Sequence, residues 1–358
     1  MRHPLHLYGT LGPSCTSETI LKKMFLSGMN GMRLNLSHAG LQQSHDWLAM
    51  YSRTAERMHI APELLVDLQG PELRIGSLDF PLDLILDDVV FLVSEHALKH
   101  TNPKETILSR IMSAEEDLSM IPCPDILFSH FQQGQELKLD DGKITLKVSA
   151  SLGEDIVCAK VIHGGKLDSR KSIAIEGISL PLPILTSEDR ENLKLFRKYG
   201  VTGVMLPFVR NADDLITLRK ELGMLGMDYI RIFAKIESLE GFENLPSLLP
   251  YCDEIVIARG DLGNSLPLSK VPALQKKISM TCLRAKKPFM VVTQLLASME
   301  ENPVPTRAEV MDIFQAVLDG ASSLMLTGET AIGHYPAQAM QVLSDTCQEA
   351  LQFKRIIR

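Results

Sequence analysis

Short apolar runs alternate with segments of helical spacing along most of this chain. The runs are bounded by glycine, proline or charged residues, and each has the length of a β-strand. This alternation predicts parallel strands joined by crossover helices. We expect the strands at residues 5–9, 31–35, 64–67, 203–206, 230–236, 254–258, 288–292 and 322–326. We expect the helices at residues 17–27, 41–59, 212–225, 239–249, 271–285, 307–318 and 336–351.

Eight strands of this kind predict a closed (β/α)₈ barrel, a TIM barrel, of the α/β class. The pattern alone also fits an open, doubly wound sheet. The chain stops just after the helix that follows the eighth predicted strand, which a closed barrel explains without further assumptions. We therefore expect the barrel to comprise residues 1–70 and 177–358.

The third predicted strand is not followed by a helix. Between residues 71 and 176 the pattern changes to an alternation of period two, most clearly on either side of Asp140-Asp141-Gly142. An Asp-Gly pair between two alternating runs predicts a β-hairpin, because glycine accepts the positive φ of the turn. We interpret residues 71–176 as an inserted small β-barrel that leaves the catalytic end of the large barrel. A hinged lid over the site is one hypothesis, and an insertion without function is the alternative.

Length, charge, apolar runs and cysteine spacing limit the classes of protein to which this chain can belong. The 358 residues suit a barrel of about 250 residues plus an insertion of about 100. The net charge of -7 provides no basic field for a nucleic acid or an anionic membrane surface. The apolar runs are far shorter than the roughly 20 residues of a membrane helix. The six cysteines form no C-x-x-C pair and nothing resembles a signal peptide, so we expect a cytoplasmic protein with reduced thiols.

Charged residues at the predicted strand ends suggest a metal site. In the run 231–237, Lys235 and Glu237 share the face opposite the apolar positions and should point into the barrel mouth. Asp261 follows the next strand, and two carboxylates with open positions suit Mg²⁺. Taken alone, Lys235 and Glu237 are equally compatible with an internal ion pair, and Asp261 with a helix cap.

Other strand ends carry neutral and cationic polar groups. Arg33 presents a guanidinium fork that suits a phosphate. Asn35, Ser37 and Asp67 could surround a monovalent cation, although a hydrogen-bonded polar plug would use the same residues. Thr293 and Thr327 end the last two strands and could relay a proton, but threonine is also an ordinary strand residue.

Taken together, these segments resemble the pyruvate kinase family. The matching motifs occur in the family's order and are TLGPS at 10–14, SGMN at 27–30, RLNLSH at 33–38, GPELR at 70–74, AKIE at 234–237, ARGDLG at 258–263, PTRAEV at 305–310, AVLDG at 316–320 and GETA at 328–331. The insertion stands where the family has its B domain. The resemblance implies phosphoryl transfer from phosphoenolpyruvate to ADP, with Mg²⁺ (or Mn²⁺) and K⁺ as cofactors.

The resemblance also implies residue roles. Lys235 would stabilise the phosphoryl group in transfer, Glu237 and Asp261 would bind Mg²⁺, and the backbone N–H groups near Gly260 and Asp261 would hold the substrate carboxylate. Thr293 would contact substrate and support protonation of the enolate, with Thr327 in the neighbouring relay. Arg33 would bind phosphate, and Asn35, Ser37 and Asp67 would bind K⁺, whose requirement the family links to Glu72. Pro13, His38, Arg74 and Lys171, with Asp141 nearby, would bind the nucleotide.

The chain departs from the family in several places. Leu68 stands where the family has a threonine that helps to bind K⁺, Gln69 and Ile332 each replace a lysine, and Ala174 and Glu176 replace Asn and Pro in the lid. The stretch 311–315 is also unusual. Family members usually continue into a C-terminal domain that carries the effector site. We therefore expect weaker nucleotide binding or another phosphoryl acceptor, no response to a sugar bisphosphate, and an assembly no larger than a homodimer.

Two other functions remain open from the sequence. A metal-dependent lyase or aldolase would stabilise a pyruvate enolate on the same two carboxylates. The lid and Lys235 favour the kinase, because an aldolase needs neither. A catalytically silent phosphoenolpyruvate-binding regulator is the third hypothesis, and the presence of Lys235 and Thr293 argues against it.

Overall fold

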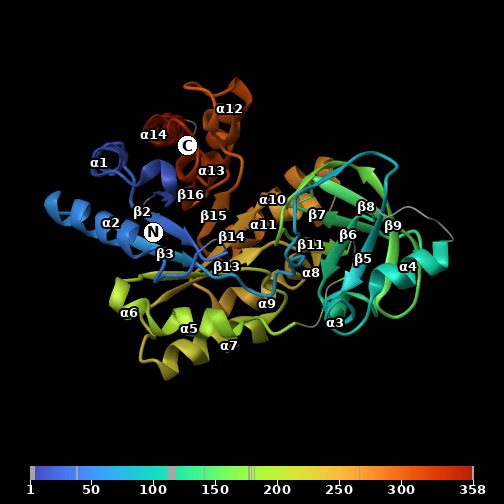
Figure 1. Ribbon diagram of the computed structural model, residues 1–358. Helices are drawn as coiled ribbons and strands as arrows, with labels where there is room; N and C mark the ends of the chain where they lie inside the picture. The colour runs from blue at the N-terminus through green and yellow to red at the C-terminus, as the bar shows by residue number, and fades with distance from the viewer. Residues whose placement is uncertain are drawn as a thin grey trace. The chain divides into compact units, whose positions relative to one another are not determined.

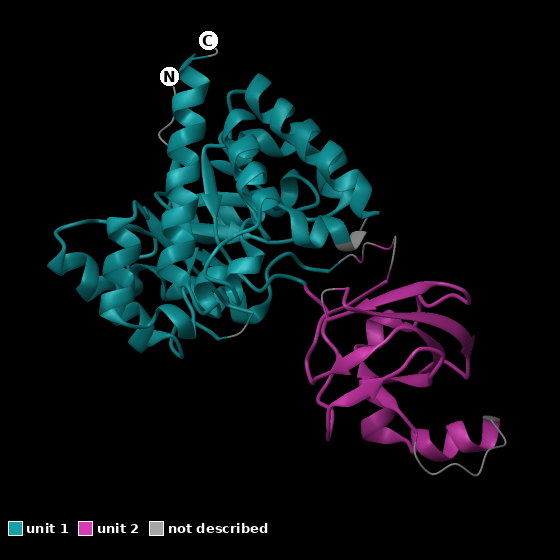
Figure 2. Ribbon diagram, turned by 90° about the horizontal axis from the view of Figure 1, so that it is seen from above, with its two compact units in different colours: residues 1–71, 182–358 teal, residues 72–181 magenta. Residues whose placement is uncertain are grey.

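The chain folds into two compact units. The computed structural model describes residues 5–37, 39–111, 118–140, 142–175, 178, 180, 182–265 and 267–356. Met1–Pro71 and Leu182–Arg358 form the first unit, and Glu72–Pro181 form the second (Figure 2). The second unit is thus an insertion in the first.

Eight parallel strands close into a barrel in the first unit (Figure 1). They are β1 (His6–Thr10), β2 (Gly31–Asn35), β3 (Glu63–Asp67), β12 (Gly203–Leu206), β13 (Arg231–Ile236), β14 (Glu254–Ala258), β15 (Phe289–Val292) and β16 (Ser323–Met325). The order around the barrel follows the chain, and β1 closes it by pairing with both β16 and β2. The predicted (β/α)₈ barrel is therefore confirmed, and the open sheet is excluded.

Helices follow the strands. They are α1 (Glu18–Leu26), α2 (His45–Arg57), α5 (Ser187–Lys194), α6 (Phe196–Tyr199), α7 (Ala212–Met224), α8 (Leu239–Glu243), α9 (Leu245–Leu248), α10 (Arg259–Ser265), α11 (Val271–Arg284), α12 (Arg307–Leu318), α13 (Gly328–Ala331) and α14 (Pro336–Ile356). Short 3-10 helices are η1 (Pro13–Cys15), η3 (Leu249–Tyr251), η4 (Leu268–Lys270) and η5 (Ala297–Glu300). No helix in the described part of the chain combines the length and the apolar run that crossing a membrane requires.

The sequence prediction missed α5 and α6, which complete the third β/α unit after the insertion. Thr186 caps α5 by accepting a hydrogen bond from the Asp189 N–H, and the Asp189 carboxylate accepts one from the Thr186 N–H in return. This capping box is a sequence-level mark of a helix start. It could have indicated α5 directly.

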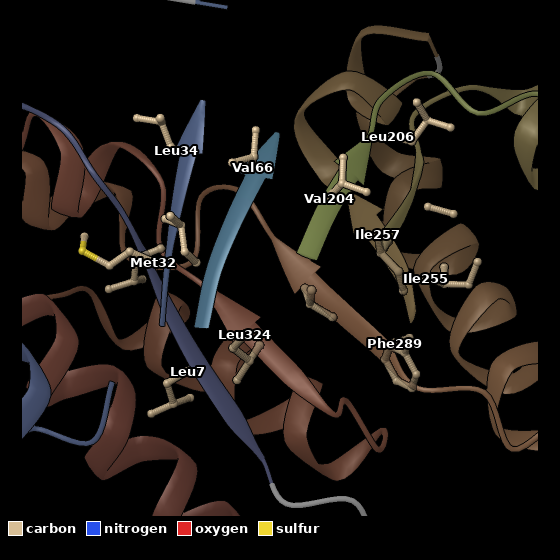
Figure 3. Packing of buried hydrophobic residues seen from close by; sticks show 14 of the residues in the cluster. Leu7, Met32, Leu34, Val66, Val204, Leu206, Ile255, Ile257, Phe289 and Leu324 are labelled. Carbon is tan, nitrogen blue, oxygen red and sulfur yellow. The ribbon is translucent and has the colours of Figure 1, made fainter. Parts of the chain in front are cut away.

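Two apolar layers hold the barrel together. The interior is filled by Tyr8, Leu65, Met205, Phe233, Val256, Ala258, Met290, Val292 and Met325. The outward faces of the strands pack against the helices in one large cluster, part of which Figure 3 shows with Leu34, Val66, Val204 and Ile255 among its labelled side chains. These two sets alternate along each strand because successive side chains of a β-strand point to opposite faces of the sheet.

Gly203 on β12 leaves room for the interior layer, and this predicts an effect on stability. A Cβ atom at this position would lie 2.7 Å from Leu65 Cδ2 and 2.7 Å from Phe233 Cε2. We expect Gly203→Ala to lower the free energy of unfolding by about 1–3 kcal/mol, because the packed ring and leucine must shift. Urea denaturation measures this change. The control Gly223→Ala, within helix α7, should be neutral or stabilising by up to about 1 kcal/mol, and equal effects of the two substitutions would contradict the packing argument.

The second unit is a small β-rich domain. Its six-stranded sheet has the order β11-β7-β8-β9-β5-β6, and β10 pairs with β4 in a two-stranded sheet. The strands are β4 (Leu82–Leu84), β5 (Val89–Ser94), β6 (Met120–Cys123), β7 (Glu136–Leu139), β8 (Ile144–Ser151), β9 (Ile156–His163), β10 (Gly165–Leu167) and β11 (Ile173–Ile175). Short helices in the described part of this unit are α3 (Glu95–His100), α4 (Pro103–Ile111) and η2 (Asp125–Leu127).

The predicted hairpin of the insertion is confirmed. Strands β7 and β8 pair in antiparallel fashion, with Leu139 opposite Ile144. The turn between them has Asp140 at a φ of 47° and Gly142 at a φ of 82°. Both values lie in the left-handed region that aspartate tolerates and glycine favours.

Candidate active site

Lys235 and Glu237 lie where the period of strand β13 predicts. Ile232, Ala234 and Ile236 belong to the cluster beneath the helices, whereas Phe233 belongs to the barrel interior. Lys235 and Glu237 follow Phe233 at intervals of two residues, so they lie on the same face of the strand and point inward at the carboxyl end of the barrel. Their side chains meet there, with Lys235 Nζ 2.8 Å from Glu237 Oε1.

Asp67 at the end of β3 joins this pair to strand β2. Its Oδ2 atom lies 3.2 Å from Lys235 Nζ and accepts hydrogen bonds from Arg33 Nε at 2.9 Å and Arg33 Nη2 at 2.6 Å. Asp67 is 1% exposed, so its charge depends on these cations. The structure thus brings four predicted site residues into one network of ion pairs.

The network fixes the charge of Lys235. Burial by itself lowers the pKa of this lysine, but the carboxylates of Asp67 and Glu237 outweigh burial and raise the pKa above its ordinary value. A lysine with a raised pKa keeps its proton throughout the neutral range. The site therefore holds a permanent positive charge beside two carboxylates, which suits the binding of an anion such as a phosphoryl group.

Glu237 is oriented by a residue that the sequence did not indicate. The Phe208 N–H donates a hydrogen bond of 2.7 Å to Glu237 Oε2. Phe208 has a φ of 52°, a left-handed conformation that is uncommon for a bulky side chain. Such strain is typical of functional sites that the surrounding structure holds in place.

Gly260 and Asp261 open helix α10 directly after β14. Asp261 is half-buried and lies close enough to Lys235 to contribute to its raised pKa. Glu237 and Asp261 therefore offer hard oxygen ligands in one place, and these suit Mg²⁺ completed by water and substrate oxygens. The described residues contain no group of three or more His, Cys, Asp or Glu side chains that could hold a metal ion by themselves, so substrate or water would have to complete such a site.

Thr293 lies against Gly260. A Cβ atom at Gly260 would be 3.0 Å from Thr293 Cγ2, so only glycine allows this approach without displacement. Thr293 and Gln294 have φ values of 74° and 54°, two consecutive residues other than glycine in the left-handed region. Arg259 holds this turn by donating from Nε and Nη2 to the Thr293 carbonyl at 3.2 Å and 2.6 Å. The Arg259 guanidinium is itself paired with Asp312 on α12.

Asp67 also carries an oxygen that suits a second cation. Its buried Oδ1 atom accepts no hydrogen bond from any described residue. An ionised oxygen left this way is costly unless a cation satisfies it, so the donor set fits the predicted K⁺ site. Asn35 and Ser37 are half-buried at the end of β2, where Asn35 Oδ1 accepts a bond of 3.2 Å from the Ser37 N–H. The Leu68 side chain is buried and offers no oxygen.

Thr327 is the predicted residue at the end of β16. Its N–H donates to Glu329 Oε2 at 2.7 Å, and its hydroxyl lies 3.3 Å from the same oxygen. Glu329 Oε1 accepts a further bond of 3.0 Å from the Leu296 N–H. The connections after β15 and β16 are therefore tied together through one carboxylate.

The predicted nucleotide residues divide between the two units. Arg74 and Lys171 are neighbours in the second unit, where Arg74 forms a β-bridge with Ser172 and Ile75 donates to the Lys171 carbonyl. Lys171 Nζ lies 2.8 Å from Asp140 Oδ1. Burial alone would raise the pKa of Asp140, but Lys171 and Lys143 lower it. Pro13 is exposed in the first unit, and His38 and Asp141 lie outside the described residues.

The chain resembles known proteins along most of its length. Residues 4–340 match the family model described as pyruvate kinase, barrel domain. The pyruvate kinase of Aeropyrum pernix is 35% identical over 350 residues, which are 98% of this chain and 71% of that protein. The pyruvate kinase of Agrobacterium vitis is 35% identical over 351 residues, covering 97% of this chain and 68% of that protein. The pyruvate kinase of Kluyveromyces lactis is 34% identical, covering 96% and 66%.

Proposed function

Because this chain belongs to the pyruvate kinase family, we propose that it transfers the phosphoryl group of phosphoenolpyruvate to ADP. The observation that carries the proposal is the buried network of Lys235, Asp67, Glu237 and Arg33 at the carboxyl end of the barrel. It places two fixed cations beside carboxylates in the position where barrel enzymes hold their substrates.

The proposed reaction has two parts. The bond between the enol oxygen and phosphorus breaks, and phosphorus forms a bond to a terminal oxygen of ADP, which gives ATP and the enolate of pyruvate. The enolate then accepts a proton at its methylene carbon, and the carbonyl of pyruvate forms. The first part depends on positioning and on charge stabilisation rather than on a covalent enzyme intermediate.

Lys235 and Arg33 would serve the first part. The Lys235 ammonium would stabilise the phosphoryl oxygens in transfer, because its charge is held by Asp67 and Glu237. Arg33 would bind the phosphate through the part of its guanidinium that Asp67 does not occupy. Mg²⁺ on Glu237 and Asp261 would supply further positive charge at the transferred group and the enolate oxygen. Backbone N–H groups near Gly260 and Asp261 would hold the substrate carboxylate.

Thr293 and Thr327 would serve the second part. Thr293 would contact the substrate from its position against Gly260, and Thr327 would take part in the relay that delivers the proton. K⁺ would bind at Asn35, Ser37 and Asp67, where the unsatisfied Oδ1 atom of Asp67 supports a cation. Pro13, His38, Arg74 and Lys171 remain the proposed nucleotide contacts.

The test follows both products. The protein is incubated with phosphoenolpyruvate, Mg²⁺ and K⁺, with and without ADP, while pyruvate and ATP are measured together. We expect the two products in equal amounts and only when ADP is present. Pyruvate formation or aldol turnover that proceeds equally well without ADP would contradict the proposal. If pyruvate forms only with another phosphoryl acceptor, that acceptor replaces ADP in the proposed reaction.

A further inference from the structure

Glu329 is a buried carboxylate to which the proposed reaction assigns no role. It is 1% exposed and lies in helix α13, two residues beyond Thr327. Its Oε1 atom accepts from the Leu296 N–H at 3.0 Å, and its Oε2 atom accepts from the Thr327 N–H at 2.7 Å. The two donors belong to different connections, one after β15 and one after β16.

The chemistry of these bonds requires a carboxylate. Both partners are backbone N–H groups, so both oxygens of residue 329 must accept. An amide offers one acceptor and one donor, and its NH₂ group would face one of the N–H donors. Burying the charge is costly, and only such saturated hydrogen bonding offsets that cost. The arrangement therefore suits a carboxyl group whose two oxygens bridge two segments.

The segment that Glu329 holds carries Thr293 in a strained conformation. Thr293 and Gln294 have φ values of 74° and 54°. Residues other than glycine in this left-handed region are strained, and they persist only where surrounding contacts hold them. Arg259 donates a hydrogen bond to the Thr293 carbonyl, and Glu329 accepts one from the Leu296 N–H three residues later. The turn is thus fixed at both ends by opposite charges.

We propose that Glu329 is a positioning residue that sets the hydroxyls of Thr293 and Thr327 relative to each other for protonation of the enolate. The inference rests on the proposed function. Glu329 itself need not touch the substrate, because it acts through the Thr327 N–H and hydroxyl and through the turn that ends at Leu296. Its loss should therefore affect proton transfer at the methyl carbon more than substrate binding.

The experiment separates these two steps with Glu329→Gln. Exchange of the methyl protons of pyruvate with deuterated solvent, followed by NMR in the presence of Mg²⁺ and K⁺, reports proton transfer without ADP. We expect this exchange rate to fall by about 10²-fold, the scale of a misplacement near 1 Å. The KM for phosphoenolpyruvate should change by less than about twofold, because ground-state binding is retained.

Glu309→Gln is the matched control. Glu309 also holds the connection after β15, where it accepts from the Ser298 N–H at 2.7 Å and the Thr306 N–H at 2.7 Å, but it contacts neither Thr293 nor Thr327 in the hydrogen bonds of the described residues. The rate of pyruvate methyl-proton exchange in the Glu309→Gln variant should stay within about twofold of the rate in the parent protein. Equal losses in both glutamine variants would overturn the proposal, because they would show only a loosened connection.

The remaining outcomes are also decisive. If the parent protein transfers no phosphoryl group, the proposed function is refuted. If the parent is active and Glu329→Gln exchanges protons at the same rate, only the role of Glu329 is refuted. Thermal unfolding shows whether the variants fold. If Glu329→Gln does not fold, Glu329→Asp replaces it, since aspartate keeps two acceptors but is too short to reach both N–H groups. Failure of both variants to fold would make Glu329 a structural residue and overturn the proposal.

Discussion

Replacing Lys235 with methionine should reduce ATP formation by about 10³-fold or more, the largest effect expected of any single substitution in this protein. The ammonium lies 2.8 Å from Glu237 and 3.2 Å from Asp67, and no other described lysine occupies this network. Methionine fills a similar volume without the charge. The transferred phosphoryl group would then lose a cation, and two buried carboxylates would lose a partner. A coupled assay of ATP formation measures the change in kcat/KM.

The same substitution should also destabilise the fold. Removing one partner of a buried ion pair leaves an uncompensated charge, which costs about 3 kcal/mol, although Arg33 still pairs with Asp67. Lys276→Met is the matched control, because Lys276 pairs with Asp319 at a half-exposed site where such a pair contributes less than about 1 kcal/mol. Urea denaturation compares the two variants. Full activity of folded Lys235→Met would eliminate the proposed mechanism.

Replacing Glu237 with glutamine should raise the Mg²⁺ concentration needed for half-maximal activity. Loss of even an outer-shell partner weakens metal binding by about 10–100-fold, so loss of a direct carboxylate ligand should reach at least the lower end of this range. Glutamine can still accept the Phe208 N–H, so the loop after β12 keeps its hydrogen bond. The substitution therefore removes the charge of the ligand and its ion pair with Lys235, while the loop after β12 stays in place.

Two measurements make this prediction specific to the metal. Mn²⁺ binding, followed by electron paramagnetic resonance, should weaken by the same factor as the Mg²⁺ requirement rises. The control Glu243→Gln changes an exposed glutamate on α8 and should leave both values unchanged. A Glu237→Gln variant that binds Mn²⁺ as tightly as the parent would remove Glu237 from the proposed metal site.

The local sequence pattern was sufficient to predict those elements that depend on residues close together along the chain. The inward direction of Lys235 follows from the period of two in β13, with Ile232, Ala234 and Ile236 packed on the other face. The β7–β8 hairpin follows from the turn preference of Asp140 to Gly142. Helix α5 shows the limit of that approach, because its capping box was present in the sequence but its apolar spacing was not distinctive.

The contacts that make the site depend on residues far apart in the sequence. Asp67 meets Lys235 because β12 pairs with both β3 and β13 in the barrel, although an insertion of more than 100 residues separates β3 from β12 in the sequence. The Phe208 N–H reaches Glu237 only through a positive φ that no residue preference of phenylalanine indicates.

The sequence by itself determined which side chains stand at the strand ends and which way they face, since strand period is a local property. The tertiary structure decided which of them meet. Barrel closure places Arg33, Asp67 and Lys235 in one ion-pair network, and Glu329 joins two connections whose donors are 31 residues apart, Leu296 and Thr327. Partners of this kind are selected by packing and backbone dihedrals, which no local pattern encodes.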